Sequence, residues 1–317
     1  MDPALERDNQ AVVNEWIRFG LRLGVSAALH PFEYSKVLIQ LGYEPIPPRP
    51  GKTLFGSPTL ILPNIFQYAG HIKKMDGFIG CYRGLAPKLV GSIVGSICSE
   101  RIADKLGLAV VIDEDTKDDA DLSDFERFSK FQLELKRDII IHVSGIVITH
   151  PFHVISIRMM AQFIGRETSY SSILGSIGEI WRNDGILGFF AGVMPKIFCD
   201  IACLTLTSST VYMANKYLIR DKESRQYFAS FTQFLFSCIL YPLQVVSTCM
   251  TVSGSNLSAG KPPFMPVYEG WVDCWNDLQA RGELKRGSSL FWRSIRPNPA
   301  FASRASIAPM PTLAKYN

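Results

Sequence analysis

A proline that directly follows a histidine or a tyrosine inside an apolar segment occurs three times, and this recurrence constrains the fold more than any other feature. The three segments read HPFEYSKVLIQLGYEP from His30, HPFHVISIRMMAQFIGRE from His150 and YPLQVVSTCMTVSG from Tyr241. A second matched element follows each segment, beginning at Tyr68, Tyr170 and Tyr268, with spacings of 102 and 98 residues. Because self-similarity at a fixed period indicates a repeat architecture, the 317 residues are predicted to contain three units of roughly a hundred residues each.

Each unit has the same order of elements: a long apolar segment, a loop, a short amphipathic helix, a Gly-rich turn and a second long apolar segment. A membrane-spanning helix needs about 20 mostly apolar residues. We therefore expect five spans, at residues 16–41, 86–112, 138–165, 194–219 and 227–252. The third unit lacks its second span, because no apolar run of that length follows Pro297.

The short helices are predicted at residues 65–72, 173–180 and 271–278, where apolar residues recur with helical spacing. Helices of this kind can lie flat at a membrane surface. The sequence thus predicts one all-α membrane domain over residues 1–317. Its parts are repeat 1 (12–112), an acidic linker (113–135), repeat 2 (136–220), a truncated repeat 3 (221–297) and a C-terminal tail (298–317).

The charges are unevenly distributed along the chain. Residues 113–126 hold eight acidic residues and one lysine, whereas the whole chain has 33 basic and 29 acidic residues. The rest of the chain is therefore basic, and the acidic run is predicted to be a solvated linker. The N-terminus has neither a secretory signal nor an Arg-rich transit sequence, so any organellar address is expected to be internal.

Sequence motifs for catalysis or cofactor binding are absent. The seven cysteines form no CxxC pair, which argues against a disulfide framework and against zinc. The five histidines stand singly, so we expect no metal site and no catalytic pair. The chain also lacks GxGxxG, P-loop, GxSxG and HExxH patterns. We therefore expect a protein that is not an enzyme, binds no cofactor and has no nucleic-acid partner.

Polar residues inside the predicted spans are the candidate functional residues, because such residues are costly in a bilayer and usually face a bundle interior or a watery cavity. Glu33, Lys36 and Gln40 lie on one helical face at i, i+3 and i+7. His142 and Arg158 are candidates on the third span, and Asp200 is the lone acid of the fourth. Two alternatives remain open: Glu33 and Lys36 pair with each other or reach the interface, and Asp200 forms a static pair with a basic residue of the bundle.

The three units resemble the mitochondrial solute carrier family, whose mark is Pro-x-acid-x-x-base at the end of each odd-numbered helix. The first copy matches fully, with Pro31, Glu33 and Lys36. The acid and base positions that follow Pro151 and Pro242 are taken by His153 and Ser156 and by Gln244 and Ser247. The family's aromatic-basic-Gly element is present as Tyr82, Arg83 and Gly84, and becomes Phe190, Ala191 and Gly192 in the second unit. The resemblance covers roughly residues 18–297.

The departures from this pattern carry most of the functional information. The resemblance implies that charge pairs between repeats close a central cavity, and two of the three pairs cannot form here. A bundle without its sixth helix would also be open sideways to lipid. The blocks YSKVLIQLGYEPIPP, THPFHVISIRMMAQFIGRE, DGILGFFAG and RGSSLFWR more closely resemble a divergent branch of the family that lies in the mitochondrial outer membrane.

That closer resemblance implies a multi-pass protein that inserts α-helical, often tail-anchored, client proteins into the outer membrane. It also implies links to scrambling of membrane lipids and to docking of a BH3-type pro-apoptotic protein, and it places Lys36 and Asp200 among polar groove positions. A hydrophilic groove open to lipid would lower the desolvation cost for a polar flank that crosses the bilayer.

Two other functions remain possible from the sequence. A degenerate solute carrier is favoured by the intact first motif and disfavoured by the two altered copies. A non-transporting receptor or scaffold in apoptosis would use the acidic run or the proline-rich stretch at residues 45–58, which is otherwise a stiff spacer loop.

Overall fold

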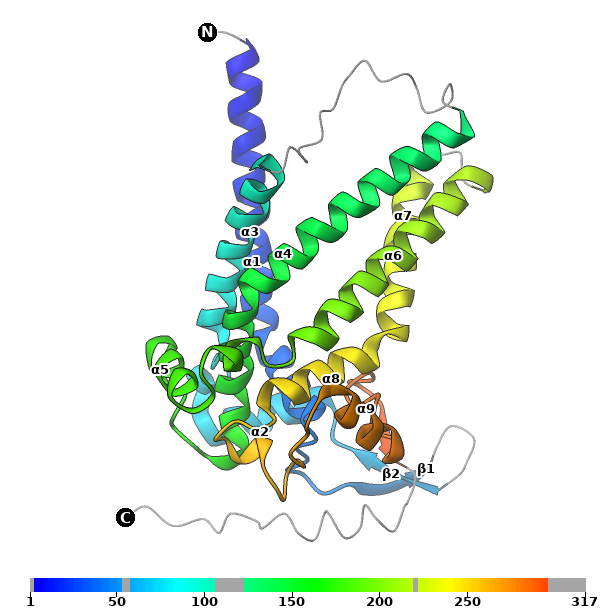
Figure 1. Ribbon diagram of the computed structural model, residues 1–317. Helices are drawn as coiled ribbons and strands as arrows, with labels where there is room; N and C mark the ends of the chain where they lie inside the picture. Colours follow the sequence, from blue (N-terminus) through cyan, green and yellow to red (C-terminus); the bar gives the residue numbers. More distant parts are fainter. Residues whose placement is uncertain (1–2, 53–57, 106–122, 219–221, 296–317) are drawn as a thin grey trace.

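Long helices form a bundle, and a layer of short helices covers one end of it (Figure 1). The computed structural model describes residues 3–52, 58–105, 123–218 and 222–295. The bundle contains α1 (Pro3–Gln40), α3 (Leu85–Lys105), α4 (Asp124–Gly165), α6 (Val193–Tyr217) and α7 (Lys222–Ile239), and α8 (Tyr241–Val252) continues from α7. The other helical elements are α2 (Ile65–Gly80), α5 (Ile173–Asp184), α9 (Trp271–Ala280) and the 3₁₀ turns η1 (Ile186–Phe190) and η2 (Ser258–Gly260). The carrier-like helical fold expected from the sequence is confirmed.

The start of α4 differs from the prediction, which extended the acidic linker to residue 135. A capping box fixes the helix start at Asp124: the Glu126 carboxylate accepts from the Ser123 amide at 2.9 Å, and the Glu126 amide donates to the Ser123 hydroxyl at 3.3 Å. Such reciprocal capping satisfies two amide groups that a helix start otherwise leaves without partners. Residues 113–122 of the acidic run and the tail at 298–317 lie outside the described residues.

Proline has different effects in the three units. Pro31 and Pro151 lie inside the continuous helices α1 and α4. The span predicted at residues 227–252 is instead divided at Leu240 into α7 and α8, which meet at an angle of 56°. Pro242 stands at the start of α8, where a proline is tolerated because the first turn of a helix has no use for its missing N–H.

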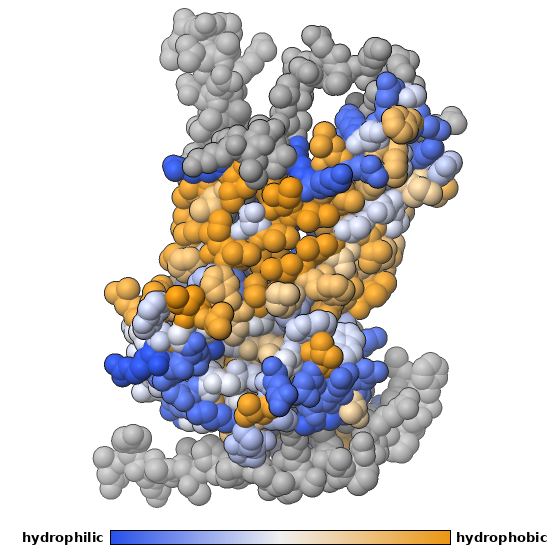
Figure 2. All heavy atoms as spheres, in the orientation of Figure 1, coloured by the Kyte–Doolittle hydropathy of each residue, from blue (hydrophilic) through white to orange (hydrophobic). Residues whose placement is uncertain are grey.

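An apolar band crosses the middle of the molecule between two polar ends (Figure 2). Two described stretches are long and apolar enough to cross a membrane: α4 (Asp124–Gly165), and Ile186–Tyr217, which comprises η1 and α6. The bent pair of α7 and α8 makes a third if it is one span. The other two expected spans do not meet this measure among the described residues. In α3 the apolar part, Leu85–Cys98, is shorter, and α1 carries Arg18, Arg22, Glu33 and Lys36.

A small antiparallel sheet was not predicted and modifies the all-α expectation. It contains β1 (Arg49–Lys52), β2 (Pro58–Leu62) and β3 (Arg293–Ile295), with β2 in the centre. The pairing of Leu60 with Ile295 brings the last described strand back to the loop of the first unit. Strands of three to five residues that pair over this sequence distance leave little local signal, because strand preference depends on tertiary context.

The apolar core lies toward the end of the bundle that the short helices cover. Tyr34 of α1, Phe163 of α4, Val246 of α8 and Leu278 of α9 are almost completely buried in one cluster. The rings of Tyr34 and Phe163 meet edge to face with centroids 6.1 Å apart, which aromatic pairs favour. Within the described part of the chain, no long helix follows α9.

Candidate functional site

One hydrogen bond is repeated at all three prolines, and it explains the residue that precedes each of them. His30 Nε2 lies 3.0 Å from the Arg83 carbonyl oxygen, and His150 Nε2 lies 2.9 Å from the Ala191 carbonyl oxygen. In the third copy the Tyr241 hydroxyl donates to the Arg286 carbonyl at 2.8 Å. Each ring thus joins the proline-containing helix of its unit (α1, α4 or α8) to a turn that comes later in the same unit.

The aromatic-basic-Gly element packs directly on these rings. Tyr82 stacks on His30 with centroids 6.4 Å apart, and Phe190 stacks on His150 at 6.5 Å. The Arg83 guanidinium forms an ion pair with Asp76 at 3.1 Å. Tyr82, Arg83 and Gly84 therefore hold the turn of the first unit against α1 and α2, and they do not line the cavity described below.

The residue after each accepting carbonyl is a glycine, and at the first two turns this glycine allows the backbone to come close to the next unit. Gly84 and Gly192 have φ values of +86° and +76°, which residues with a side chain rarely adopt. A Cβ at Gly84 would lie 2.8 Å from the Ser156 carbonyl oxygen, and one at Gly192 would lie 2.5 Å from that of Ser247. The two serine hydroxyls donate to the Gly84 and Gly192 carbonyls, each at 2.8 Å.

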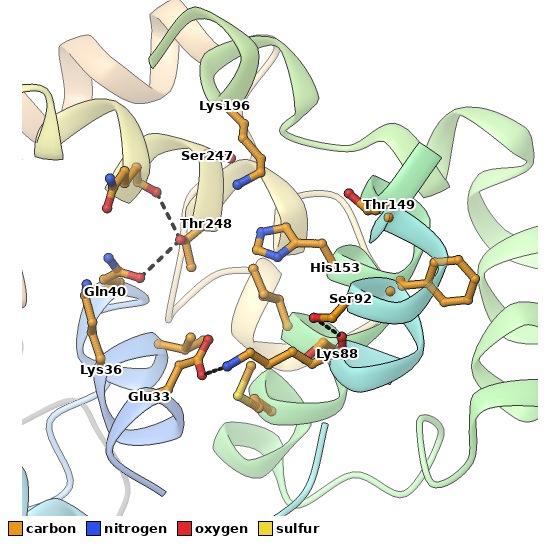
Figure 3. A pocket seen from close by; sticks show the side chains of 18 of the residues that line it. Glu33, Lys36, Gln40, Lys88, Ser92, Thr149, His153, Lys196, Ser247 and Thr248 are labelled. Atoms are coloured by element: carbon orange, nitrogen blue, oxygen red, sulfur yellow. Dashed lines mark hydrogen bonds and ion pairs between the residues drawn. The ribbon is translucent and has the colours of Figure 1, made fainter. Parts of the chain in front are cut away.

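A cavity of about 540 Å³ lies between α1, α3, α4, α6 and α8 (Figure 3). All six acid and base positions of the proline motifs line it: Glu33, Lys36, His153, Ser156, Gln244 and Ser247. Two lysines and an acid from α3 and α6 complete its charged lining: Lys88, Lys196 and Asp200. The cavity thus forms where the three proline motifs face one another.

The charges in the cavity are mostly paired. Glu33 forms an ion pair with Lys88, and Lys196 Nζ lies 4.0 Å from the Asp200 carboxylate one helical turn away. Lys36 lies over the ring of Tyr241, 5.2 Å from its centroid. No carboxylate of the described residues lies within ion-pair distance of Lys36, so this lysine gives the cavity a positive excess.

Gln40 connects the cavity wall to the third unit. Its side chain is 5% exposed, donates to the Tyr241 hydroxyl at 3.0 Å and accepts from the Thr248 hydroxyl at 3.1 Å. These bonds attach the end of α1 to α8. They take the place that the serine–glycine bonds have at the other two junctions.

The comparison with known proteins gives the family. The model of the family described as mitochondrial carrier protein matches residues 140–222. Mitochondrial carrier homolog 2 of Mus musculus and of Homo sapiens are each 38% identical, over 86% of this chain and 91% of the relative. Mitochondrial carrier homolog 1 of Mus musculus is 34% identical, over 93% of this chain and 80% of the relative.

The chain belongs to the mitochondrial carrier homolog family. Its helical bundle and apolar band agree with that membership, and this carrier homolog is a mitochondrial membrane protein.

Four of the predicted groove residues line the cavity of the carrier homolog: Glu33, Lys36, Gln40 and Asp200. The alternatives left open by the sequence are resolved by geometry. Glu33 pairs with Lys88 and not with Lys36, and Asp200 has Lys196 as its basic neighbour. Both carboxylates remain about two-fifths exposed at the side chain, so both stay accessible from the cavity.

The other two predicted groove residues, Arg158 and His142, lie outside the cavity lining, which corrects the prediction. Arg158 is 1% exposed and pairs with Asp184 at 2.5 Å. It also donates to the Thr251 carbonyl at 3.0 Å, so it projects toward α5 and α8 instead. His142 is exposed on α4, nine residues before Pro151, which is about 13 Å along the helix axis from the level of the proline motif.

Two charged cavity residues were missed by the sequence analysis, Lys88 and Lys196. A signal for the lysines exists, because both stand four residues after the turn glycine, in GLAPK and GVMPK. The first turns of α3 and α6 therefore carry a lysine at the equivalent position in the two units. His153 was identified only as a replacement for the acid of the motif.

Ion pairs and hydrogen bonds also connect the loops and short elements of different units to one another. Arg166 of the second unit pairs with Asp76 of the first at 2.7 Å, and the Ser258 hydroxyl donates to the Glu167 carboxylate at 2.7 Å. Arg293 beside β2 pairs with Glu44, which also accepts from the Tyr68 hydroxyl at 2.5 Å. Burial, and then the Glu44 charge, raises the pKa of Tyr68 well above its usual value, so the hydroxyl remains a donor.

Proposed function

We propose that this carrier homolog inserts α-helical, tail-anchored proteins into the mitochondrial outer membrane, using the cavity as a hydrophilic passage. The observation that carries the proposal is a cavity of about 540 Å³ with three lysines and two carboxylates in its lining. Charged side chains at this depth of a helical bundle are costly and are associated with pathways for polar groups.

The physical basis is a lower desolvation cost for the client. A short polar flank of a tail-anchored helix must cross the apolar band, and burying its polar groups without partners costs several kcal/mol, about 2–7 for a single amide or hydroxyl. Partners for such a flank are present in the cavity as Lys36, Asp200 and the hydroxyls of Ser247 and Thr248. The apolar part of the client would meanwhile remain in lipid, beside the open side of the bundle.

The same passage suits a second cargo, because a lipid headgroup has the same need for polar partners during transfer between leaflets. Lipid scrambling therefore belongs to the proposal as a related activity of one cavity. Docking of a BH3-type protein requires a surface and not a passage. It stays a separate hypothesis.

The test is insertion of a radiolabelled tail-anchored client into liposomes that contain only the purified protein. Wild type is compared with Lys36→Glu and Asp200→Asn, which change the cavity charge, and with Lys261→Glu as a matched control at an exposed site outside the cavity. We expect insertion by wild type and the control and an altered yield in both cavity variants. Equal yields for all four proteins would contradict the role of the cavity.

A degenerate solute carrier is the second candidate. It is favoured by the complete motif of Pro31, Glu33 and Lys36 and by the match to the carrier family at residues 140–222. Saturable uptake of a metabolite into the same liposomes would support it. A third candidate, a non-transporting receptor, would be supported if deletion of the acidic run at residues 113–126 abolished partner recruitment and left insertion unchanged.

A further inference from the structure

Two buried thiols and a guanidinium form a cluster that neither the cavity nor the proline motifs explain. Cys249 of α8 and Cys274 of α9 are both 0% exposed and belong to one buried cluster, in which the two thiol groups interact with each other. Arg286 Nη2 donates to the Cys249 sulfur at 3.3 Å. The two thiols are therefore neighbours in the core beside a positive charge.

The other buried thiols have no such surroundings in the described part of the chain. Cys81 donates to the Gly77 carbonyl at 3.6 Å, and Cys199, which lines the cavity, donates to the Leu240 carbonyl at 3.7 Å; neither has a guanidinium as a hydrogen-bond partner. A buried thiol with a carbonyl as its neighbour stays protonated and inert, whereas a thiol beside a guanidinium is more readily ionised and reactive. Cys81 is thus an internal reference for Cys249.

Arg286 is held in its charged state at this place. Burial disfavours the charge, yet the Cys249 sulfur and Glu283 outweigh burial and raise the pKa of Arg286. Glu283 lies 3.2 Å from Arg286 Nη1. The guanidinium therefore remains available to stabilise a thiolate at Cys249.

We propose that Cys249 is an oxidation site for hydrogen peroxide and that Cys274 is its resolving partner, so that a Cys249–Cys274 disulfide forms. In the first step the Cys249 thiolate attacks one peroxide oxygen and the O–O bond breaks. The hydroxide that leaves takes the thiol proton and becomes water, and Cys249 becomes a sulfenic acid. In the second step the Cys274 sulfur attacks the Cys249 sulfur, and the S–O bond breaks. The second hydroxide leaves with the Cys274 proton, again as water.

The cavity provides the approach for the oxidant. The Cys249 thiol donates to the backbone carbonyl of Gln40 at 3.5 Å, and the side chains of Gln40 and Thr248 line the cavity. Peroxide is little larger than water, and in this proposal it reaches the buried sulfur from the cavity, past Gln40 and Thr248. The disulfide would join α8 to α9 covalently and remove the bond from Cys249 to α1.

The test exposes the purified protein in liposomes to hydrogen peroxide, alkylates the remaining thiols under unfolding conditions and identifies the peptides by mass spectrometry. We expect the Cys249–Cys274 peptide pair to form before Cys81 is oxidised in the same sample. This comparison requires no variant, so it does not depend on a mutant that folds. Oxidation of Cys81 at the same rate as Cys249, or recovery of both cluster thiols as alkylated peptides, would overturn the proposal.

Two variants separate the roles within the cluster. Cys274→Ser should leave a sulfenic acid on Cys249 that dimedone traps, and Arg286→Met should slow oxidation of Cys249 by about tenfold, because it removes the charge that favours the thiolate. Cys81→Ser is the matched control and should leave the rate unchanged. An Arg286→Met protein that is oxidised at the wild-type rate would exclude the role of the guanidinium.

Discussion

The junctions between the units of this carrier homolog are of two kinds. At the first two, Ser156 and Ser247 occupy the base position of the proline motif and donate to the carbonyls of Gly84 and Gly192. At the third, Lys36 occupies the same position and makes no such bond. There the turn glycine, Gly287, lies against Ile39 and Gln40, about one helical turn farther along α1.

This difference shows how loss of charge and retention of charge are used in one molecule. A hydroxyl is short and neutral, so it can attach a turn permanently to the next helix at little desolvation cost. A lysine at the same position keeps its charge in the cavity, and Gln40 takes over the structural bond to α8. The first two junctions are thus structural, and the third leaves in the cavity a charge that has no carboxylate partner among the described residues.

The largest expected effect tests whether water is excluded from the junction between the second and third units. Arg158→Met leaves Asp184 without its partner and removes the bond to the Thr251 carbonyl. We expect the free energy of unfolding in detergent to fall by about 3–5 kcal/mol, because one half of a buried pair is left uncompensated. Arg281→Met breaks the more exposed pair with Asp277 and should cost at most about 1 kcal/mol. Equal losses would mean that Arg158 is solvated.

The next effect tests the close approach of the turn glycine. Gly192→Ala forces a side chain into a left-handed conformation, at about 1–2 kcal/mol, and against the Ser247 carbonyl, at about 1–3 kcal/mol more. Gly254→Ala is the control, because Gly254 has φ +74° but no neighbour within 4 Å of its Cβ position. Thermal unfolding should separate the two variants, and identical melting temperatures would contradict the tight contact.

A smaller effect concerns the loop side of the third junction. Glu44→Gln replaces a charge-assisted partner of Arg293 and Tyr68 by a neutral amide. We expect a loss of roughly 1.5–3 kcal/mol, the range for hydrogen bonds to charged groups. Amide hydrogen exchange should become faster in β2 and β3. Glu269→Gln, at an exposed carboxylate, is the control, and unchanged exchange in the Glu44 variant would show that the sheet does not depend on this pair.

The smallest effect compares the two kinds of junction directly. Ser156→Ala and Ser247→Ala should each lower the free energy of unfolding by about 0.5–1.5 kcal/mol, because each leaves a glycine carbonyl without its donor. Lys36→Met should not lower it, since this change removes a half-buried charge that has no carboxylate partner among the described residues. Unfolding in urea measures all three. A Lys36→Met protein that is less stable than either serine variant would make the third junction structural as well.

Much of the fold could be predicted from repetition in the sequence. The spacing of Tyr68, Tyr170 and Tyr268 located the short helices α2, α5 and α9, because their apolar residues recur with helical period. Other features could not be predicted in this way. The sheet depends on the pairing of β2 with β3 across more than two hundred residues, and the bend at Leu240 depends on how one of three similar prolines is accommodated.

Part of the site could also be predicted from regular spacing in the sequence. Helical spacing placed Glu33, Lys36 and Gln40 on one face, and that face lines the cavity. The same reasoning failed for Arg158, because periodicity defines faces of a helix but does not tell which neighbour each face meets. Its partner Asp184 lies on α5, and no local pattern connects the two.

The sequence by itself determined the three proline motifs and the loss of charge in two of them. These are properties of residue type and spacing, which need no knowledge of neighbours. Only the tertiary structure decided that Lys36 has no carboxylate partner among the described residues while Glu33 and Asp200 have lysines, and that Cys249 lies beside Cys274 and Arg286. Such partnerships join side chains from helices far apart in the chain, and they exist only after the helices have packed.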